Sequence, residues 1–166
     1  MNSIFARSSV RHYLDQPIEK EKVDLILRAG FAAPSAMNAQ PWEFIVIDDP
    51  KVNQQLSELS PYAKMLAKAP LGIVVCANLE RSHMIDFCEQ DCAAATQNML
   101  VEAKTLEIGS VWLGMYPLED RVNALREYFQ LPEHIVPLWM IAFGYPDEKE
   151  NIKDKFHEEF IHYQKW

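Results

Sequence analysis

Four short apolar runs, rich in β-branched and aromatic residues, constrain this chain more than any other feature. They cover residues 43–47 (EFIVI), 71–77 (LGIVVCA), 110–116 (SVWLGMY) and 136–145 (VPLWMIAFGY). Runs of this kind predict buried strands. The remaining periodic segments predict helices over residues 3–8, 19–29, 50–60, 61–70, 86–106 and 118–129. The chain is therefore predicted to be an α+β protein with a central sheet flanked by helices.

The length of the chain and its net charge exclude some classes of function. The 166 residues are enough for one domain, residues 1–166, with its own core. The net charge of -8 argues against a non-specific nucleic-acid binder, and an anionic ligand would need a local basic pocket. No apolar run is long enough for a membrane span, and the first residues lack the apolar core of a signal peptide. We expect a cytoplasmic protein that binds neither nucleic acid nor membrane.

Three cysteines leave two interpretations open. Cys88 and Cys92 are four residues apart, so both can lie on one helix face, and His83 is nearby. These residues could form a metal cluster. Buried free thiols in a reducing compartment are the simpler interpretation, and we predict no metal site.

The signatures of the common phosphate-binding loops are missing. The chain has only five glycines and neither a GxGxxG nor a GxxxxGK[ST] motif. An anion site must therefore be built from side chains. The segment RSSVRHY places Arg7 and Arg11 four residues apart, with Ser8 and Ser9 between them. Two forked cations and two hydroxyls suit a phosphate, although the arginines could also be solvated or salt-bridged on the surface.

Two further segments are unusual. The stretch APSAMNAQPW, residues 33–42, is longer and more polar than a connection to the following strand requires. The last residues, EEFIHYQKW, carry aromatic side chains that a compact monomer has little reason to expose. We interpret this tail as a segment that docks onto a partner chain.

Four blocks of the sequence together resemble the FMN-dependent nitroreductase family in its short single-domain form. The blocks are RSSVRHY (7–13), APSAMNAQPWEFIVI (33–47), DCAAATQNMLVEAKTLEIGSVWLGMYP (91–117) and GYPDEKENIKDKFHEEFIHYQKW (144–166). The resemblance implies a three-layer fold with a central mixed sheet of about four to five strands. It also implies a homodimer that exchanges its final strand, with FMN bound at the subunit interface.

The resemblance also implies which residues hold FMN. Phosphate, ribityl chain and pyrimidine edge would contact one chain, and a wall of the flavin site would come from the partner's loop. The implied cofactor-binding residues are Arg7, Ser8, Ser9, Arg11, Lys64, Leu113, Gly114, Lys153 and Lys155 of one chain, and Pro34, Ser35, Ala36 and Asn38 of the other. The backbone at Gly114 would approach flavin N5, because glycine has no Cβ. Gln40 and Trp42 would brace the loop, and Trp42 could also simply be a core residue.

The implied reaction passes hydride from NAD(P)H through flavin N5 to a flat electrophile, such as a nitroaromatic or a quinone, by a ping-pong scheme. FMN carries the chemistry, so no catalytic acid or base is expected from the protein. Two alternatives stay open: a non-catalytic flavin-binding or flavin-sensing protein, and a related flavin-dependent dehalogenase or enone reductase.

Two expectations concern the helix over residues 86–106. Its face of small residues, with Cys92, Ala95, Thr96 and Met99, is interpreted as the centre of the dimer interface. Where relatives often have a left-handed capping glycine after this helix, the chain has Glu107, so we expect an altered helix end.

Overall fold

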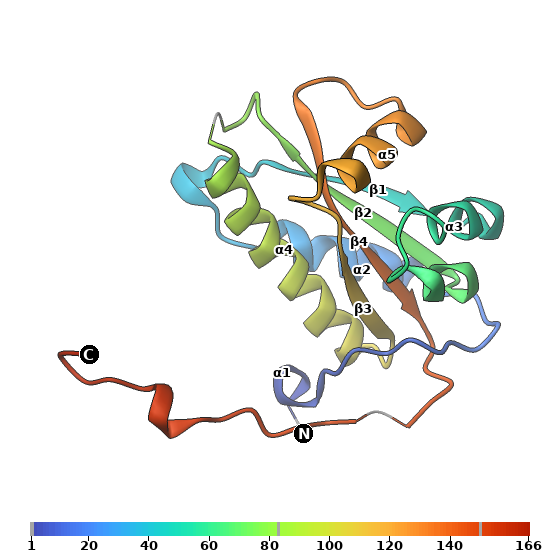
Figure 1. The fold of residues 1–166 in the computed structure, drawn as a ribbon. Helices are drawn as coiled ribbons and strands as arrows, with labels where there is room; N and C mark the ends of the chain where they lie inside the picture. The colour runs from blue at the N-terminus through green and yellow to red at the C-terminus, as the bar shows by residue number, and fades with distance from the viewer. Residues whose placement is uncertain (1, 83, 150) are drawn as a thin grey trace.

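The computed structural model describes residues 2–82, 84–149 and 151–166. It is built from helices and strands that alternate along most of the chain (Figure 1). The α-helices are α1 (Ser3–Ala6), α2 (Lys20–Phe31), α3 (Pro50–Leu56), α4 (Ile85–Thr105) and α5 (Glu119–Phe129). The strands are β1 (Trp42–Ile47), β2 (Leu71–Asn78), β3 (Gly109–Gly114) and β4 (Ile135–Gly144). Short 3-10 turns are η1 (Ala36–Asn38), η2 (Lys64–Lys68) and η3 (Glu158–Phe160).

The four strands form one sheet in the order β1-β2-β4-β3, and each neighbouring pair is antiparallel. The expectation of a mixed sheet is therefore wrong for these strands. Among the described residues, the parallel bridge that the structure contains joins Ser9, which lies outside the strands, to Ser110 of β3. It lays the N-terminal segment along β3, where the N–H of Val10 donates to the carbonyl of Ser110 at 3.0 Å.

Helices cover both faces of the sheet, giving the expected three layers (Figure 1). β2 is buried along its whole length, and its side chains alternate between the two faces. Ile73 and Val75 pack toward α2 and α4, whereas Val74 and Cys76 pack toward α3, η2 and α5. A strand buried on both faces reads as a continuous apolar run, as LGIVVCA does.

The small-residue face of α4 packs inside its own chain. Cys92, Ala95 and Thr96 have no exposed surface and face the sheet, and the Thr96 hydroxyl accepts a hydrogen bond of 2.8 Å from Trp139 Nε1. The expectation that this face forms the centre of a dimer interface is therefore wrong. Small side chains allow a helix to approach a sheet as closely as another helix, and the pattern does not distinguish the two.

α4 ends with a left-handed residue even though that residue is not glycine. Glu107 has φ 63°, and the N–H of Ile108 donates to the carbonyl of Ala103 at 2.8 Å. The N–H of Glu107 donates to the carbonyl of Lys104 at 3.2 Å, which completes a Schellman motif. The helix end is thus of the ordinary kind, and the expectation that Glu107 would alter it is wrong.

Glu107→Gly is expected to raise the free energy of unfolding by about 1 kcal/mol, because a left-handed conformation strains a residue that has a Cβ. Urea unfolding measures the change. Glu102→Gly in the same helix is the control and should lower stability by about 1 kcal/mol, since glycine is unfavourable inside a helix. A lower stability for Glu107→Gly as well would contradict the strain.

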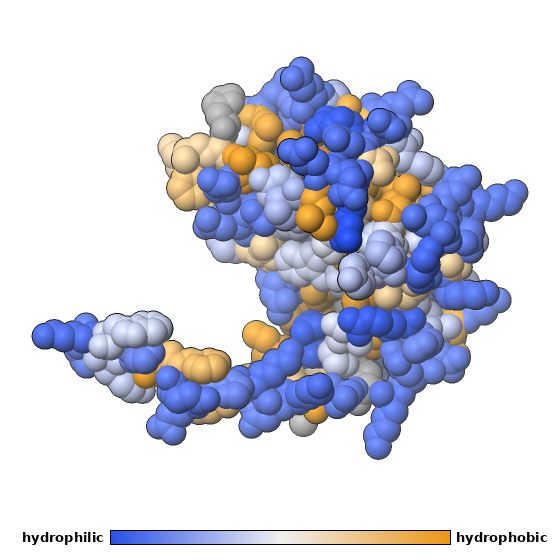
Figure 2. Space-filling model, viewed as in Figure 1, coloured by the Kyte–Doolittle hydropathy of each residue, from blue (hydrophilic) through white to orange (hydrophobic). Residues whose placement is uncertain are grey.

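The C-terminal tail, residues 151–166, runs away from the body of the chain (Figures 1 and 2). Every residue in it is exposed, and η3 is its one regular element among the described residues. Its large apolar side chains are at least 42% exposed: Ile152, Phe156, Phe160, Ile161, Tyr163 and Trp166. Its own chain therefore leaves the apolar side chains of this tail largely uncovered. The exchanged final strand stays a prediction.

Candidate functional site

A hollow of about 500 Å³ brings the two ends of the chain together. Arg7 from the N-terminal segment and Lys153 and Lys155 from the tail line it, along with Ile4, Phe5, Gln97, Ile152, Asp154 and Phe156. No ion pair within the described parts of the chain involves any of these three cations. In a chain of net charge -8, three cations around one hollow form the local basic pocket that an anionic ligand needs.

A second hollow, of about 630 Å³, lies at the end of β3. Leu113 and Gly114 line it, as do Arg11, Pro61, Tyr62, Met65, Val111, Trp112, Tyr116, Pro117, Leu118 and Arg121. A Cβ added to Gly114 would meet no atom within 4 Å. On this side no side chain covers the backbone of Gly114, so a flat ligand can approach the backbone closely.

A third hollow, of about 460 Å³, adjoins the second, because Arg11 and Met65 line both. Its other lining residues include Lys64 and Lys68. The structure thus brings Arg11 and Lys64 to one place although they are far apart in sequence. Lys64 Nζ is paired with Glu58 Oε2 at 2.5 Å, and both side chains are more than half exposed.

Glu148 fixes the backbone of the RSSVRHY segment. Its Oε1 accepts hydrogen bonds from the N–H groups of Arg11 at 2.7 Å and His12 at 3.3 Å, and its Oε2 lies 2.9 Å from His12 Nδ1. These donors favour the ionised carboxylate, so the pKa of Glu148 lies below its usual value, with the Arg11 N–H as the largest cause. Sequence reasoning missed this residue because its partners lie 136 and 137 positions away.

Glu148→Gln is expected to lower the free energy of unfolding by about 0.5–1 kcal/mol at pH 7, because an exposed carboxylate gives only a modest gain. The pKa of Glu148 is lower in the folded chain than in the unfolded chain. Its contribution is therefore full above the unfolded value and is lost as pH falls through the folded value. Urea unfolding at pH 7 and at pH 3.5 should show the difference from wild type shrinking in acid. Glu133→Gln, at an exposed site, is the control; a pH-independent difference for Glu148→Gln would contradict the assignment.

The loop between α2 and β1 is held in an unusual backbone conformation. Met37, Asn38 and Gln40 all have positive φ, at 53°, 56° and 48°. The loop is pinned from within, because the N–H of Gln40 donates to Ser35 Oγ at 3.0 Å and Gln40 Nε2 donates to Asn38 Oδ1 at 3.2 Å. Strained backbone that its surroundings hold in place is common in ligand-binding loops.

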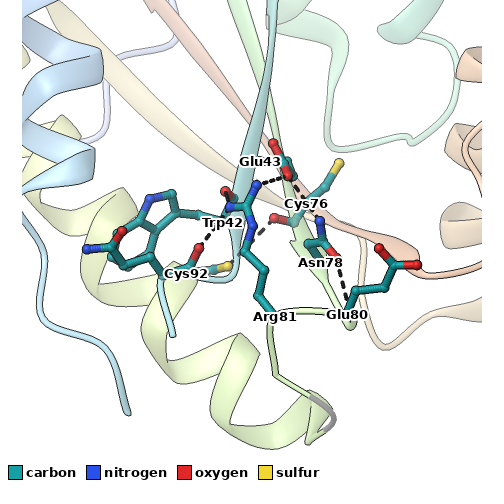
Figure 3. Close-up of polar contacts among 8 residues, drawn as sticks. Trp42, Glu43, Cys76, Asn78, Glu80, Arg81 and Cys92 are labelled. Atoms are coloured by element: carbon teal, nitrogen blue, oxygen red, sulfur yellow. Dashed lines mark hydrogen bonds and ion pairs between the residues drawn. The ribbon is translucent and has the colours of Figure 1, made fainter. Parts of the chain in front are cut away.

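Residues outside the loop also hold it. Asp91 on α4 accepts a hydrogen bond of 2.9 Å from the N–H of Ala36. Arg81, just beyond β2, donates from Nη1 to the carbonyls of Gln40 at 2.9 Å and Trp42 at 3.2 Å, and is ion-paired with Glu43 (Figure 3). Asn78 completes the network by donating to Glu43 Oε1 at 3.1 Å. Sequence reasoning found neither Asp91 nor Arg81, since no motif signals contacts made over such separations.

Within one chain the loop does not line the hollows that Arg7, Arg11 and Gly114 line. Pro34, Ser35, Ala36 and Asn38 line none of the three hollows described above. Ser9 is exposed and Ser8 half-buried, both on the segment that runs along β3. Trp42 is only 1% exposed and belongs to the core.

The described cysteines are buried free thiols. Burial raises the pKa of Cys76 to about 12 and also raises the pKa of Cys88 and Cys92. The described residues contain no group of three or more His, Cys, Asp or Glu side chains that could hold a metal ion. His83, the third member of the metal alternative, lies outside the described residues. A search of the described helices found none with the length and apolar character that a membrane span requires.

Comparison with known proteins shows which family this chain belongs to. The sequence model of the Nitroreductase family matches residues 4–62 and 57–145. A protein of Archaeoglobus fulgidus, provisionally named NADH dehydrogenase/NAD(P)H nitroreductase, is 45% identical over all of this chain and 98% of its own length. A protein of Methanothermobacter thermautotrophicus with the same provisional name is 40% identical over all of this chain and 87% of its own length.

A solved structure agrees with these matches over the whole chain. The FMN-dependent nitroreductase of Clostridium difficile superposes with a TM-score of 0.93 at 29% identity, covering 99% of each chain. The match includes the segments that bring Arg7, Leu113 and Gly114 to the hollows. The chain described here belongs to the nitroreductase family.

Proposed function

We propose that this chain is an FMN-dependent oxidoreductase that passes electrons from NAD(P)H to a flat electrophile, such as a nitroaromatic or a quinone. The observation that carries the proposal is the set of cations Arg7, Lys153 and Lys155 around one hollow of an acidic protein, none of them in an ion pair with another described residue. A phosphate fits this set, and the bare backbone of Gly114 suits the approach of a flat ring. The FMN-dependent nitroreductase of Clostridium difficile supports the same cofactor.

When bound, FMN would supply two-electron redox chemistry between donor and acceptor. The chain's own residues would bind and orient it. Arg7, Lys153 and Lys155 would hold the phosphate, and the Gly114 backbone would leave room for the flat ring. Arg11 and Lys64 line a common hollow, from which they would favour negative charge on the ring. No side chain needs to act as a catalytic acid or base.

Donor and acceptor share one place in this scheme and occupy it in turn. For a nitroaromatic, the overall change is NAD(P)H + H⁺ + ArNO₂ giving NAD(P)⁺ + ArNO + H₂O. For a quinone, the same donor and proton give the hydroquinone. A single shared cavity predicts ping-pong kinetics, with parallel lines in double-reciprocal plots.

The proposed site is completed by a second copy of the chain. The loop at 34–38 lines none of the three hollows described above, although internal bonds, Asp91 and Arg81 all hold it in place. The exposed aromatic tail gives a second reason for a partner. We therefore propose a homodimer in which each loop forms a wall of the other chain's flavin site. A cytoplasmic location stays a prediction.

Reconstitution followed by anaerobic reduction tests the function. The purified chain should bind FMN and not FAD, and the flavin absorption should bleach on addition of NADH or NADPH. Nitroaromatics, quinones, enones and halogenated aromatics are then compared as oxidants. A bound flavin that stays oxidised with both donors would indicate a flavin-binding or flavin-sensing protein. Turnover confined to enones or halogenated aromatics would indicate the related reductase or dehalogenase.

A further inference from the structure

Arg121 is a cation that lines the second hollow and that the reaction scheme above does not use. It lies in the first turn of α5 and lines the same hollow as Gly114. Its Nη1 donates to the carbonyl of Gly114 at 3.3 Å, and its guanidinium carbon lies 5.5 Å from the centre of the Tyr62 ring. Two contacts thus orient the guanidinium beside the residue that the flavin is proposed to approach.

The position of Arg121 is unfavourable for helix stability. Glu119 and Asp120 precede it in the first turn of α5, where the helix dipole favours negative charge and disfavours a cation. Within the described residues, Arg121 forms an ion pair with neither of them nor with any other carboxylate. The described residues therefore orient the guanidinium but leave its charge without a carboxylate, which directs attention to an anionic ligand.

The hollow itself is aromatic and lacks acidic groups. Tyr62, Trp112 and Tyr116 line it, and none of its described lining residues is Asp or Glu. Aromatic walls suit a flat ring, and an oriented guanidinium suits a carboxylate, which it can bind through two parallel hydrogen bonds. The FMN phosphate does not need Arg121, because the first hollow already offers Arg7 and the two tail lysines.

We propose that Arg121 is a specificity-determining residue that selects flat electron acceptors carrying an acidic group, such as nitroaromatic carboxylates. The inference rests on the proposed function for its reaction, and concerns which acceptors the same cavity prefers. Tyr62 and the Gly114 carbonyl hold the guanidinium before the acceptor arrives, which reduces the entropy lost on binding.

A matched pair of acceptors tests the proposal: 4-nitrobenzoate, which is anionic, and 4-nitrobenzyl alcohol, which is neutral. The FMN-loaded protein is first reduced without air and then mixed with each acceptor, so that the donor reaction is measured separately. The ratio of kcat/KM for the anionic over the neutral acceptor should fall about tenfold in Arg121→Gln, mainly through KM, because one charge-assisted contact is lost. Arg121→Lys should retain an intermediate ratio, since lysine keeps the charge without the fork.

Arg126→Gln is the matched control on the same helix. Arg126 donates to the carbonyl of Pro132 at 2.8 Å and does not line the hollow. Its substitution should leave the acceptor ratio at the wild-type value. An equal ratio in Arg121→Gln and Arg126→Gln would overturn the proposal. So would a loss in Arg121→Gln that appears only in reduction by NADH, because Arg121 would then recognise the pyrophosphate of the donor.

A binding measurement separates this proposal from the proposed function. Trp112 lines the hollow, so 4-nitrobenzoate should quench tryptophan fluorescence saturably, about tenfold more weakly in Arg121→Gln than in Arg126→Gln. This readout needs no turnover. A protein that reduces no acceptor but shows this difference would refute the oxidoreductase function and keep the anion site. A protein that turns over both acceptors but binds 4-nitrobenzoate equally in both variants would refute the role of Arg121 alone.

Discussion

Gly114→Ala is expected to weaken FMN binding by about 30-fold or more while leaving the fold intact, because overpacking a close contact costs about 2 kcal/mol. The added Cβ would meet no atom of the chain within 4 Å, so it fills only the space that the flavin is proposed to occupy. Removing a glycine also restricts the unfolded chain, so the free energy of unfolding of the flavin-free protein should stay level or rise slightly. Titration with FMN and urea unfolding measure the two effects.

Gly109→Ala, at the other end of β3, is the matched control. Its Cβ would lie 2.8 Å from Val10 Cβ, so this substitution should destabilise the fold. Flavin loss in that variant should follow from unfolding and not from a blocked site. Gly114→Ala binding FMN as tightly as wild type would show that the ring does not approach this strand.

Removal of residues 158–166 is expected to abolish the homodimer and flavin binding together. The deleted segment contains Phe160, Ile161, Tyr163 and Trp166, which are all exposed in the single chain. Aromatic anchors of this kind dominate interface energies, so the dimer dissociation constant should rise by about 100-fold or more. Sedimentation velocity and flavin absorbance on the same sample measure both quantities. Lys165→Ala in the full chain is the control and should change neither.

The two possible failures of the truncation have different meanings. A truncated chain that is monomeric yet fully loaded with FMN would refute a site shared between subunits. A truncated chain that stays dimeric and fully loaded would refute only the role given to the tail, and the loop at 34–38 could still form the partner's wall.

The sequence predicted the strands well because each is a short apolar run with little helical character. All four expected runs became strands, and the main helices lie where periodicity placed them. Strand direction was predicted wrongly, since an apolar run carries no information about its neighbours' orientation. The prediction that the small-residue face of α4 packs against a partner chain was also wrong. Ala95 and Thr96 fit closely against a sheet as well as against a helix, so the pattern does not distinguish the two.

The candidate site was also predictable only in part. Arg7 and Arg11 stand out locally, as a pair of cations without nearby acids. Their association with Lys153 and Lys155 came from family resemblance, because no local pattern connects positions so far apart. Asp91, Arg81 and Arg121 escaped notice because each acts through contacts that exist only once strands and helices have packed. Positive φ at Met37 and Gln40 was equally hidden, since neither residue type favours it.

The strand order also governs when the protein can fold during its synthesis. β4 lies between β2 and β3 in the sheet, so these two earlier strands have no common neighbour until residues 135–144 have left the ribosome. The N-terminal segment can dock only after that, because Tyr13 bridges to Pro146 and the N–H groups of Arg11 and His12 donate to Glu148. Such long-range closure makes folding slow and late. A nascent chain should therefore remain sensitive to proteases and dependent on chaperones until Pro146 and Glu148 have left the ribosome.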